Sequence, residues 1–482
     1  MLSPIAVPVT GLERWLLALV CVATLVFAII TPPFQAPDEN QHYMKSLLLA
    51  DGRIMTEQRG PEIGAELPRS ALDLHGIDFP TDITGQARRF DRTMVERAWD
   101  ADAGRPGTAF ADFPNVANYA PTLYAPAAAG LMIGDALGLP RIGSFYAGRL
   151  VNAASGLILL AMAFGLMPFG RAALMATALL PTFCSQTGSL SPDAVINGMA
   201  FVGLALSLRL AAMGSNPARG AGLIVTAPLL ALAKGVYLPL MAAGLQWPQH
   251  RRDARPWLLI GAMAVGAAAF ILWMKMSGGS QALYHIVSRK TGEDVMTAPL
   301  AAQLGVILGD PVGYVRALGS SIAERSPVYL LQIVGRFGWN AILLPLLAYV
   351  LAAVMLAAAV ASGSGVRVSV GQRLWWLVVA IGTGMLIETA MYLTGTPLGA
   401  DYVQGTQGRY FLPLLPLALL ALMPQTGMRG ACSIFAGSAL LLLMIALAST
   451  LDSFWMHGFV TDDGMPPHER LSSALLLPSP RW

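Results

Sequence analysis

The chain has 482 residues, of which 55% are hydrophobic and only 12% are charged, and its mean hydropathy is +0.58. A soluble domain carries about 25% charged residues, so this composition excludes an ordinary soluble protein. The basic residues are too dispersed for a nucleic-acid-binding surface, and no nucleic-acid partner is expected. The apolar residues fall in blocks of roughly 17 to 25, the length that crosses a bilayer as a helix, without the alternation of a membrane barrel. The sequence therefore predicts an all-α polytopic membrane protein, with residues 1–482 forming one membrane domain.

The first apolar run, from Trp15 to Ile30, is predicted to be an uncleaved membrane anchor. It lacks the small-x-small pattern of a cleavage site, and it runs directly into Thr31-Pro32-Pro33. Further apolar blocks follow, which together predict a bundle of about eleven transmembrane helices. The predicted spans are residues 14–31, 143–167, 172–188, 193–213, 221–234, 235–247, 257–275, 341–361, 374–393, 410–424 and 431–449.

Several segments do not have the form of a simple span. The apolar stretch 221–247 is too long for one crossing and is interrupted by Lys234, so two short helices forming a hairpin are expected. Segment 121–138 contains two prolines and an aspartate, which suggests a helix lying at the membrane surface. Residues 41–50 and 299–335 show apolar residues at helical spacing, which predicts amphipathic helices resting on the outer surface.

The distribution of charge predicts the orientation of the chain. The most basic short loop, 250–255, is assigned to the cytoplasm by the positive-inside rule. Residues 32–120 hold 14 acidic and 9 basic side chains, a net charge of −5 that is typical of an exported segment. The N-terminus is therefore expected in the cytoplasm, and residues 32–142, 276–340 and the tail 450–482 outside it. Single arginines of other short loops then fall on the cytoplasmic side: Arg171, Arg219, Arg367, Arg373 and Arg429.

The strongest local signal is the stretch FQAPDENQHY, just after the first span. Two adjacent carboxylates, Asp38 and Glu39, follow the span within about eight residues, and Pro32, Pro33 and Pro37 stiffen the segment. A carboxylate in this place suits a base that acts on an acceptor hydroxyl, or a ligand of a divalent metal. The alternative is helix capping, in which Asp38 caps a helix that starts near Glu39. The residues alone leave both interpretations open.

A second signal is QGTQGRYFLP, where Arg409 stands at the outer mouth of a predicted span. Its glycines allow close approach of a ligand, and a guanidinium suits bidentate phosphate binding. The alternative is an arginine that snorkels to the interface or pairs with lipid headgroups.

Four further charged residues lie in or beside apolar segments. Asp193, in SLSPD, is either a functional acid or simply an acid in the first turn of its helix. Lys234 is costly to bury, so it is a candidate for binding an anion in a polar cavity. Glu388 and Arg149 need partners within the membrane domain, and an arginine is the expected partner of Glu388.

Aromatic and histidine side chains give weaker signals. Tyr119 and Tyr124 are spaced by prolines and are candidates for lining a groove, although aromatic residues are common at membrane interfaces. His42, His75 and His285 do not have the spacing of a zinc site.

Seven motifs occur in order over nearly the whole chain: PPFQAPDENQHY, NYAPTLYAP, GRLVNAASG, SLSPDA, AKGVYLPL, GRFGWN and QGRYFLPLLP. Together they resemble the bacterial membrane family called domain of unknown function 2142 (DUF2142). That family is grouped with the GT-C superfamily of membrane glycosyltransferases, which includes protein mannosyltransferases and the aminoarabinose transferase that acts on lipid A. The resemblance implies a GT-C-like helical bundle in the bacterial inner membrane, with a large extracytoplasmic loop after the first helix.

The resemblance also implies roles for individual residues. Asp38 matches the catalytic acidic position, with Glu39 beside it as support or as an alternative base. Arg409 matches a basic residue that binds the lipid-linked phosphate, and Lys234 is a looser match. Asp193 resembles a second acidic position, which helps to bind a metal such as Mg²⁺ or Mn²⁺ in some members of the superfamily and not in others.

The leading prediction is therefore an inverting glycosyltransferase that takes a sugar from a polyprenyl-phosphate donor. The acceptor is an envelope glycan, lipid or protein on the extracytoplasmic side, and one base suffices for direct displacement. The alternatives are a transporter or flippase for such a lipid, for which inverted repeats are expected but not found, and a non-catalytic envelope assembly protein. The enzymatic prediction requires Asp38 and Arg409 to share one cavity at the outer edge of the bilayer. The predicted groove for the substrates is lined by His42, Tyr119, Tyr124, Asp193, Gln407 and Tyr410.

Overall fold

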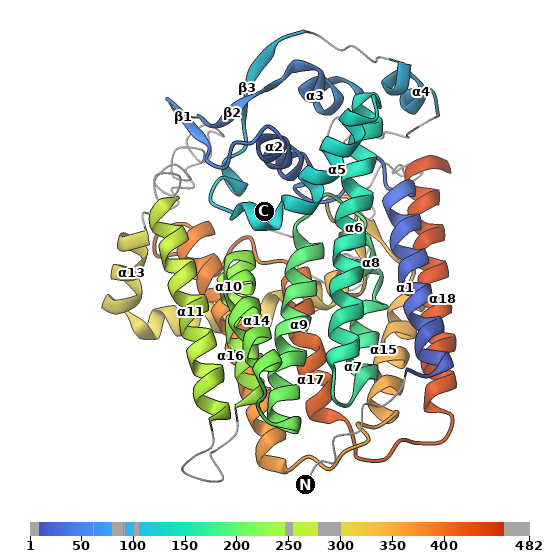
Figure 1. Cartoon of the computed structure of the whole chain (residues 1–482), viewed down its shortest axis with the longest axis vertical. Coiled ribbons are helices and arrows are strands. Elements are labelled where there is room, and N and C mark those ends of the chain that lie inside the picture. Colours follow the sequence, from blue (N-terminus) through green and yellow to red (C-terminus); the bar gives the residue numbers. More distant parts are fainter. Residues whose placement is uncertain are drawn as a thin grey trace.

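The computed structural model shows a bundle of long helices with a cap of short strands and helices over one end (Figure 1). The helical membrane protein predicted from the sequence is confirmed, but the all-α class is corrected by the small sheet of the cap. The structure describes residues 9–60, 62–79, 90, 92–100, 106–245, 254–277 and 300–456. Residues 250–253 of the basic loop 250–255 therefore lie outside the described residues, as do parts of 276–340 and of the tail.

Seven helical segments among the described residues are long and apolar enough to cross a membrane, so the predicted count of about eleven is not confirmed. They have lengths of 20 to 28 residues. These segments are α1 (Gly11–Ile30), α6 (Arg141–Leu166), α9 (Asp193–Met213), α10 with the 3-10 helix η4 (Pro217–Lys234 and Gly235–Gly244), α11 (Arg255–Met276), α16 (Val370–Gly395), and α18 with the π-helical turn η7 (Ala431–Leu451 and Asp452–Met456).

Other predicted spans are shorter or broken. The predicted span 172–188 divides into α7 (Arg171–Ala178) and α8 (Pro181–Thr187), because Pro181 forces the preceding residue out of the helical conformation. The span 410–424 likewise begins as a 3-10 helix. The other elements of the bundle are α13 (Leu300–Gly309), α14 (Pro311–Val334), β4 (Arg336–Phe337), β5 (Ile342–Leu343), α15 (Leu346–Ala361), η6 (Gly408–Leu414) and α17 (Leu415–Leu422).

Residues 217–244, which have the length and composition of one crossing segment, fold into the hairpin predicted around Lys234. Lys234 itself has an extended backbone between α10 and η4. The far end of η4 returns to the end of the bundle where α10 begins, since Ala243 accepts a hydrogen bond from Trp376 Nε1 at 3.0 Å near the start of α16. Lys234 therefore lies at the tip of the hairpin, at the capped end of the bundle.

The cap is built from the segment between α1 and α6. Its three strands form an antiparallel sheet in the order β1-β2-β3, and Gly64 of β2 approaches β3 so closely that a Cβ would lie 1.6 Å from Ala111 O. The elements are α2 (Glu39–Ala50), β1 (Glu57–Arg59), β2 (Glu62–Pro68), α3 (Arg69–Asp73), the π-helical turn η1 (Leu74–Asp78), α4 (Arg92–Asp100), β3 (Thr108–Asp112), η2 (Pro114–Val116), η3 (Pro121–Leu123) and α5 (Ala125–Ala136). With 12 residues, α5 is too short to cross a bilayer.

Helix α2 is not a surface helix, contrary to the prediction for 41–50. Its residues from His42 to Leu48 are all buried, because the sheet, η2 and α5 pack over it. Lys45 is tied into the cap by hydrogen bonds from Nζ to the carbonyls of Ala117 at 3.1 Å and Ile54 at 3.3 Å.

Helices α13 and α14 each pack one face on the bundle, since one residue of α13 and five of α14 are buried, which fits the amphipathic helices predicted for 299–335. Gln303 of α13 is fully buried and donates to Tyr392 O of α16 at 2.9 Å. The ring of Tyr329 in α14 lies 5.3 Å from that of Phe411 in η6, so α14 packs directly against the segment that carries Arg409.

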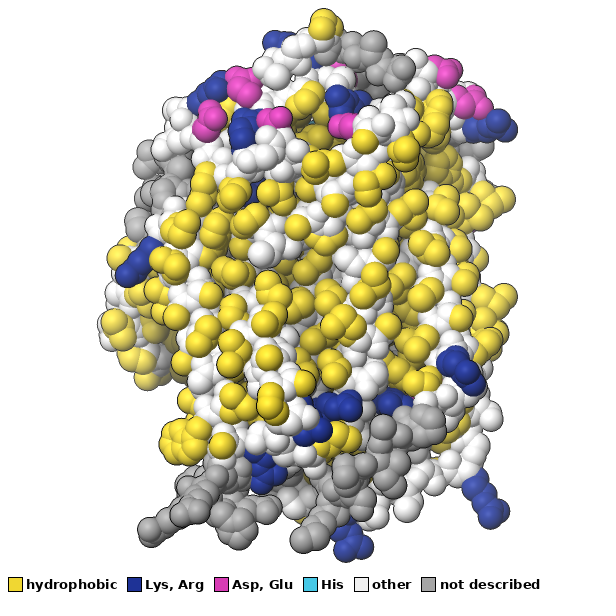
Figure 2. All heavy atoms as spheres, viewed as in Figure 1, with side chains coloured by type: hydrophobic (Ala, Val, Ile, Leu, Met, Phe, Trp, Pro, Cys, Tyr) yellow, Lys and Arg dark blue, Asp and Glu magenta, His cyan; other side chains and the backbone are white. Residues whose placement is uncertain are grey.

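Charged side chains are sorted between the two ends of the molecule. On the face drawn in Figure 2, apolar side chains cover a broad band, acidic and basic side chains mix over the cap, and only basic side chains gather at the opposite end. Arg209 and Arg219 lie at that opposite end, where they donate to the last carbonyls of α6 and α9. This is the sorting that the positive-inside rule requires if the cap is extracytoplasmic.

Candidate functional site

Asp38 and Glu39 are neighbours in the chain but enter different surroundings. Asp38 immediately precedes α2 and adopts a left-handed backbone conformation with φ of 61°. This conformation turns the two side chains apart. The Asp38 carboxylate makes no capping hydrogen bond to α2, so the capping alternative is not realised for this residue.

Glu39 is completely buried and forms an ion pair with Arg149 of α6. Arg149 donates through Nε to Oε1 at 2.8 Å and through Nη2 to Oε2 at 2.6 Å. The same carboxylate accepts from the backbone N–H groups of Leu190 and Phe34, each at 2.9 Å. Both oxygens of Glu39 are therefore used within the protein.

Arg149 and Asn152 extend this network to two loops. Arg149 also donates to the carbonyls of Ala28 and Pro32, at 2.9 and 3.0 Å, and so fixes the end of α1. One turn further along α6, Asn152 Nδ2 donates to the carbonyls of Ser189 and Ser191, both at 2.8 Å. We call Glu39, Arg149 and Asn152 the buried junction, which holds the loops before Asp38 and Asp193.

The charged groups predicted to carry function meet at the capped end of the bundle. Arg409 Nη2 donates to Asp38 Oδ2 at 2.8 Å, and Arg409 Nη1 lies 3.6 Å from Asp193 Oδ2. Gln186 Oε1 accepts from Arg409 Nη1 at 3.2 Å. We call Asp38, Asp193, Lys234 and Arg409 the outer charge cluster.

Exposure differs within the outer charge cluster. The side chain of Arg409 is 7% exposed and that of Asp193 14%, whereas that of Asp38 is 28% exposed. Asp38 is therefore the most accessible group that contacts Arg409. Asp38 and Arg409 come together as predicted, and they are in direct contact.

The position of Arg409 is set by the segment before it. A Cβ on Gly408 would lie 2.3 Å from Tyr329 O, so only glycine allows this approach to α14. The Gly408 N–H donates to Gln332 Oε1 at 2.6 Å, which fixes the residue before Arg409. Two residues earlier, Thr406 Oγ1 donates to Glu388 Oε2 at 3.0 Å.

This last contact identifies the hydrogen-bond partner of Glu388. Glu388 is 1% exposed and accepts a hydrogen bond from the Thr406 hydroxyl, and an arginine, Arg325, acts on it electrostatically, as expected. The residue therefore helps to hold the 404–408 segment.

Lys234 approaches the cluster from the tip of its hairpin. Its ammonium nitrogen lies 3.7 Å from the centroid of the Tyr410 ring, a cation–π geometry. Tyr237 OH donates to Tyr410 O at 2.8 Å and couples η4 to η6. Two cations therefore lie near the Tyr410 ring, because the Arg409 guanidinium carbon is 5.5 Å from the same centroid.

His42, Tyr119 and Tyr124 form a polar wall beside the cluster. His42 Nδ1 and Tyr124 OH share a hydrogen bond of 3.0 Å. Burial lowers the pKa of His42 to about 4, although the negative charge of Asp38 acts in the opposite direction. Burial raises the pKa of Tyr119 and of Tyr124, so all three side chains are neutral near pH 7.

Some residues predicted from the sequence are not explained by this geometry, and others were missed. Gln407 precedes η6 and does not cap it with its side chain. Gln186 and Asn152 were missed because neutral amides in apolar or helical segments give no charge signal. Within the described part of the chain, no group of three or more His, Cys, Asp or Glu side chains is arranged to hold a metal ion. The acids of the cluster instead face Arg409.

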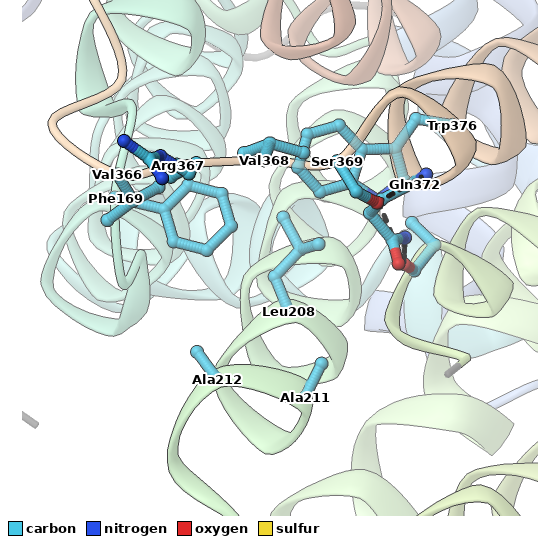
Figure 3. A pocket seen from close by; sticks show the side chains of 11 residues that line it. Phe169, Leu208, Ala211, Ala212, Val366, Arg367, Val368, Ser369, Gln372 and Trp376 are labelled. Carbon is cyan, nitrogen blue, oxygen red and sulfur yellow. Dashed lines mark hydrogen bonds between the residues drawn. The ribbon is translucent and has the colours of Figure 1, made fainter. Parts of the chain in front are cut away.

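A pocket of about 240 Å³ lies at the other end of the bundle (Figure 3). Leu208 and Ala212 of α9 line it together with Arg367, Gln372 and Trp376. Asp193 starts α9, and the 1.5 Å rise per residue puts Leu208 about 22 Å further along. This pocket is therefore separate from the outer charge cluster.

Comparison with known proteins identifies one family. The family described as predicted membrane protein (DUF2142) matches residues 21–418, which include every member of both networks described above. The resemblance inferred from the motifs is thereby confirmed. No curated protein and no solved structure matches the chain.

Proposed function

We propose, from the premise that this chain belongs to the DUF2142 family of predicted membrane proteins, that it is a glycosyltransferase of the GT-C type. It transfers a sugar from a polyprenyl-phosphate donor to an acceptor of the cell envelope. The reaction takes place at the capped end of the bundle, on the extracytoplasmic side of the bacterial inner membrane, and the N-terminus is cytoplasmic. The sorting of charge between the two ends supports this orientation.

The observation that carries the proposal is the contact between Asp38 and Arg409 beside Lys234. A polyprenyl phosphate has a charged head and long apolar tails, so its site needs cations next to a surface that accepts hydrocarbon. The guanidinium of Arg409 and the ammonium of Lys234 supply the charge, and the helices around them supply the apolar surface. An accessible carboxylate in the same place supplies a base.

The proposed chemistry is a single displacement. Asp38 accepts the proton of the acceptor hydroxyl while the hydroxyl oxygen forms a bond to the anomeric carbon of the sugar. The bond from that carbon to the phosphate oxygen breaks, and the electron pair stays on the phosphate. Arg409 and Lys234 stabilise the charge that develops there, and the configuration of the anomeric carbon is inverted.

Glu39 is not assigned as the base. Its carboxylate is fully buried and accepts two hydrogen bonds from Arg149 and two from backbone N–H groups. Removing a proton from an acceptor would require a buried ion pair to separate, which is costly. We therefore assign Glu39 to positioning Asp38 and the loop before Asp193.

The experiment that tests the proposal is mass spectrometry of envelope glycans from cells that lack the gene. The same cells are complemented with the wild type, with Asp38→Asn, or with Asp135→Asn as a matched control. Asp135 is half-exposed and pairs with Arg141 at 3.2 Å, apart from the cluster. Wild type and control should restore a missing sugar, and Asp38→Asn should not, although it is present at the normal level.

Restoration of the sugar by Asp38→Asn would contradict the assignment of the base. Transfer by the purified wild type in vesicles then separates an enzyme from a flippase, because a flippase moves the lipid and leaves its sugar attached. An unchanged glycan profile in cells without the gene would favour an assembly protein.

A further inference from the structure

The Asp38–Arg409 contact has a consequence for the order of events at the site. The guanidinium of Arg409 has five N–H donors on three nitrogens. Its Nη1 is held by Gln186 Oε1 at 3.2 Å and lies 3.6 Å from Asp193 Oδ2. These two contacts fix the inner side of the guanidinium.

The edge of the guanidinium formed by Nε and Nη2 is only half used. Nη2 donates to Asp38 Oδ2 at 2.8 Å. Nε is buried and has no hydrogen-bond partner among the described residues. A buried N–H without a partner is unfavourable, so this edge is incomplete as it stands. A phosphate that binds an arginine in the bidentate manner takes two adjacent donors at once, which here means Nε and Nη2.

We propose that the donor phosphate displaces Asp38 from Arg409, so that Asp38 becomes free to act as a base only after the donor has bound. This inference rests on the proposed function, because it assumes a phosphate-bearing donor. In the free protein the Arg409 contact occupies the carboxylate and keeps it from an acceptor. When phosphate oxygens bind Nε and Nη2, the carboxylate loses this partner while Gln186 keeps the arginine in place.

The charges near Arg409 favour such an exchange. Lys234 faces the Tyr410 ring, and no ion pair of its ammonium is found in the described part of the chain. A phosphate bound to Arg409 therefore has a second cation close by. Asp38 is 28% exposed, so it can turn towards solvent without being left buried and unpaired.

The exchange is tested by binding and not by turnover. The probe is a polyprenyl monophosphate without sugar, titrated into the purified protein in lipid nanodiscs. If Asp38 competes with the phosphate, Asp38→Asn should bind the probe about tenfold more tightly than the wild type, the factor given by 1.4 kcal/mol. Asp38→Ala, which removes the neutral hydrogen bond as well, should bind at least as tightly. Asp135→Asn should bind like the wild type.

Two further measurements make the result specific. Melting temperatures establish that each variant is folded, and inorganic phosphate in place of the probe separates a lipid phosphate from a free anion. Much weaker binding of inorganic phosphate is expected, because it lacks the apolar chain. Equal or weaker probe binding by both folded Asp38 variants overturns the exchange.

The outcome is distinguishable from failure of the proposed function. If the wild type transfers sugar but the Asp38 variants bind the probe no more tightly, the exchange is wrong and the function stands. If the variants bind more tightly but the wild type transfers no sugar, the arginine is a phosphate site whose access Asp38 controls, and the enzymatic function is wrong.

Discussion

Two acid–arginine pairs lie side by side at the junction of the bundle and its cap, and they differ in burial and in the number of their contacts. In the buried junction, Glu39 and Arg149 are both 0% exposed, and every oxygen of the carboxylate is bonded. In the outer charge cluster, Asp38 is 28% exposed and makes one hydrogen bond to Arg409. Adjacent residues of the same charge thus lie in opposite environments.

The difference follows from what each pair needs in order to separate. Breaking a buried pair leaves an uncompensated charge in a dry interior, which is strongly unfavourable. Breaking the outer pair returns Asp38 to solvent and leaves Arg409 with Gln186 and Asp193. The buried junction is therefore suited to holding the backbone of the site in place. The Asp38–Arg409 pair of the outer charge cluster is suited to separating when a ligand binds.

The largest expected effect is on stability, at the buried junction. Glu39→Ala leaves Arg149 buried without its counter-ion, and we expect a loss of about 3 to 5 kcal/mol. The measurement is the yield and melting temperature of the detergent-solubilised protein, compared with Asp38→Ala. Similar melting temperatures for the two variants would contradict the division between the pairs.

The next effect is a pH dependence of stability that comes from His42. Its pKa in the folded protein is about 4, below the value of about 6.5 for an unperturbed histidine. Between these values the unfolded chain binds a proton that the folded protein does not, so His42 makes stability fall as the pH is lowered from 6.5 to 4. His42→Gln should remove this part of the slope of melting temperature against pH. Parallel slopes for wild type and variant would show that His42 is not held neutral.

A smaller effect is expected at the edge of the buried junction. Asn152→Ala removes the donors of two buried carbonyls, those of Ser189 and Ser191. Leaving such groups without a partner costs about 1 to 3 kcal/mol. Because this loop positions Asp193, the melting temperature and the affinity for polyprenyl monophosphate should both decrease. A lower melting temperature with unchanged affinity for polyprenyl monophosphate would show that the loop before Asp193 does not position the outer charge cluster.

The smallest effect is expected from Arg409→Lys. A lysine keeps the positive charge but cannot offer two coplanar donors, so the donor concentration needed for half-maximal transfer should rise about tenfold. Arg141→Lys is the matched control, since Arg141 also pairs with an outer aspartate, at 3.2 Å. Unchanged donor dependence in the Arg409 variant would argue against a bidentate phosphate contact.

Part of this arrangement could be predicted from the sequence. Asp38, Asp193 and Arg409 each lie next to the outer end of an apolar segment, and helices that cross the same membrane bring such ends to one level. Lys234 could be placed there because a charge in the middle of a long apolar stretch indicates a turn. The length and spacing of apolar blocks carried that information.

The remaining features depend on contacts that no local pattern encodes. Glu39 and Arg149 are 110 residues apart, and the sequence does not show that α2 is covered by a sheet. The strands of that sheet are three to seven residues long and lie in a polar segment, so they give no clear period. The helices η4 and η6 are 3-10 helices with an internal proline each, Pro239 and Pro413, and their apolar sequences predicted α-helical spans. Helix lengths were therefore predicted less well than the positions of charges.

The most direct test of the account is a structure determined by electron microscopy in nanodiscs with bound polyprenyl monophosphate. We expect density for the phosphate in contact with Arg409 Nε and Nη2 and close to Lys234, with the Asp38 carboxylate turned away and the Glu39–Arg149 pair unchanged. A phosphate bound elsewhere, with the 2.8 Å contact between Asp38 and Arg409 intact, would contradict it.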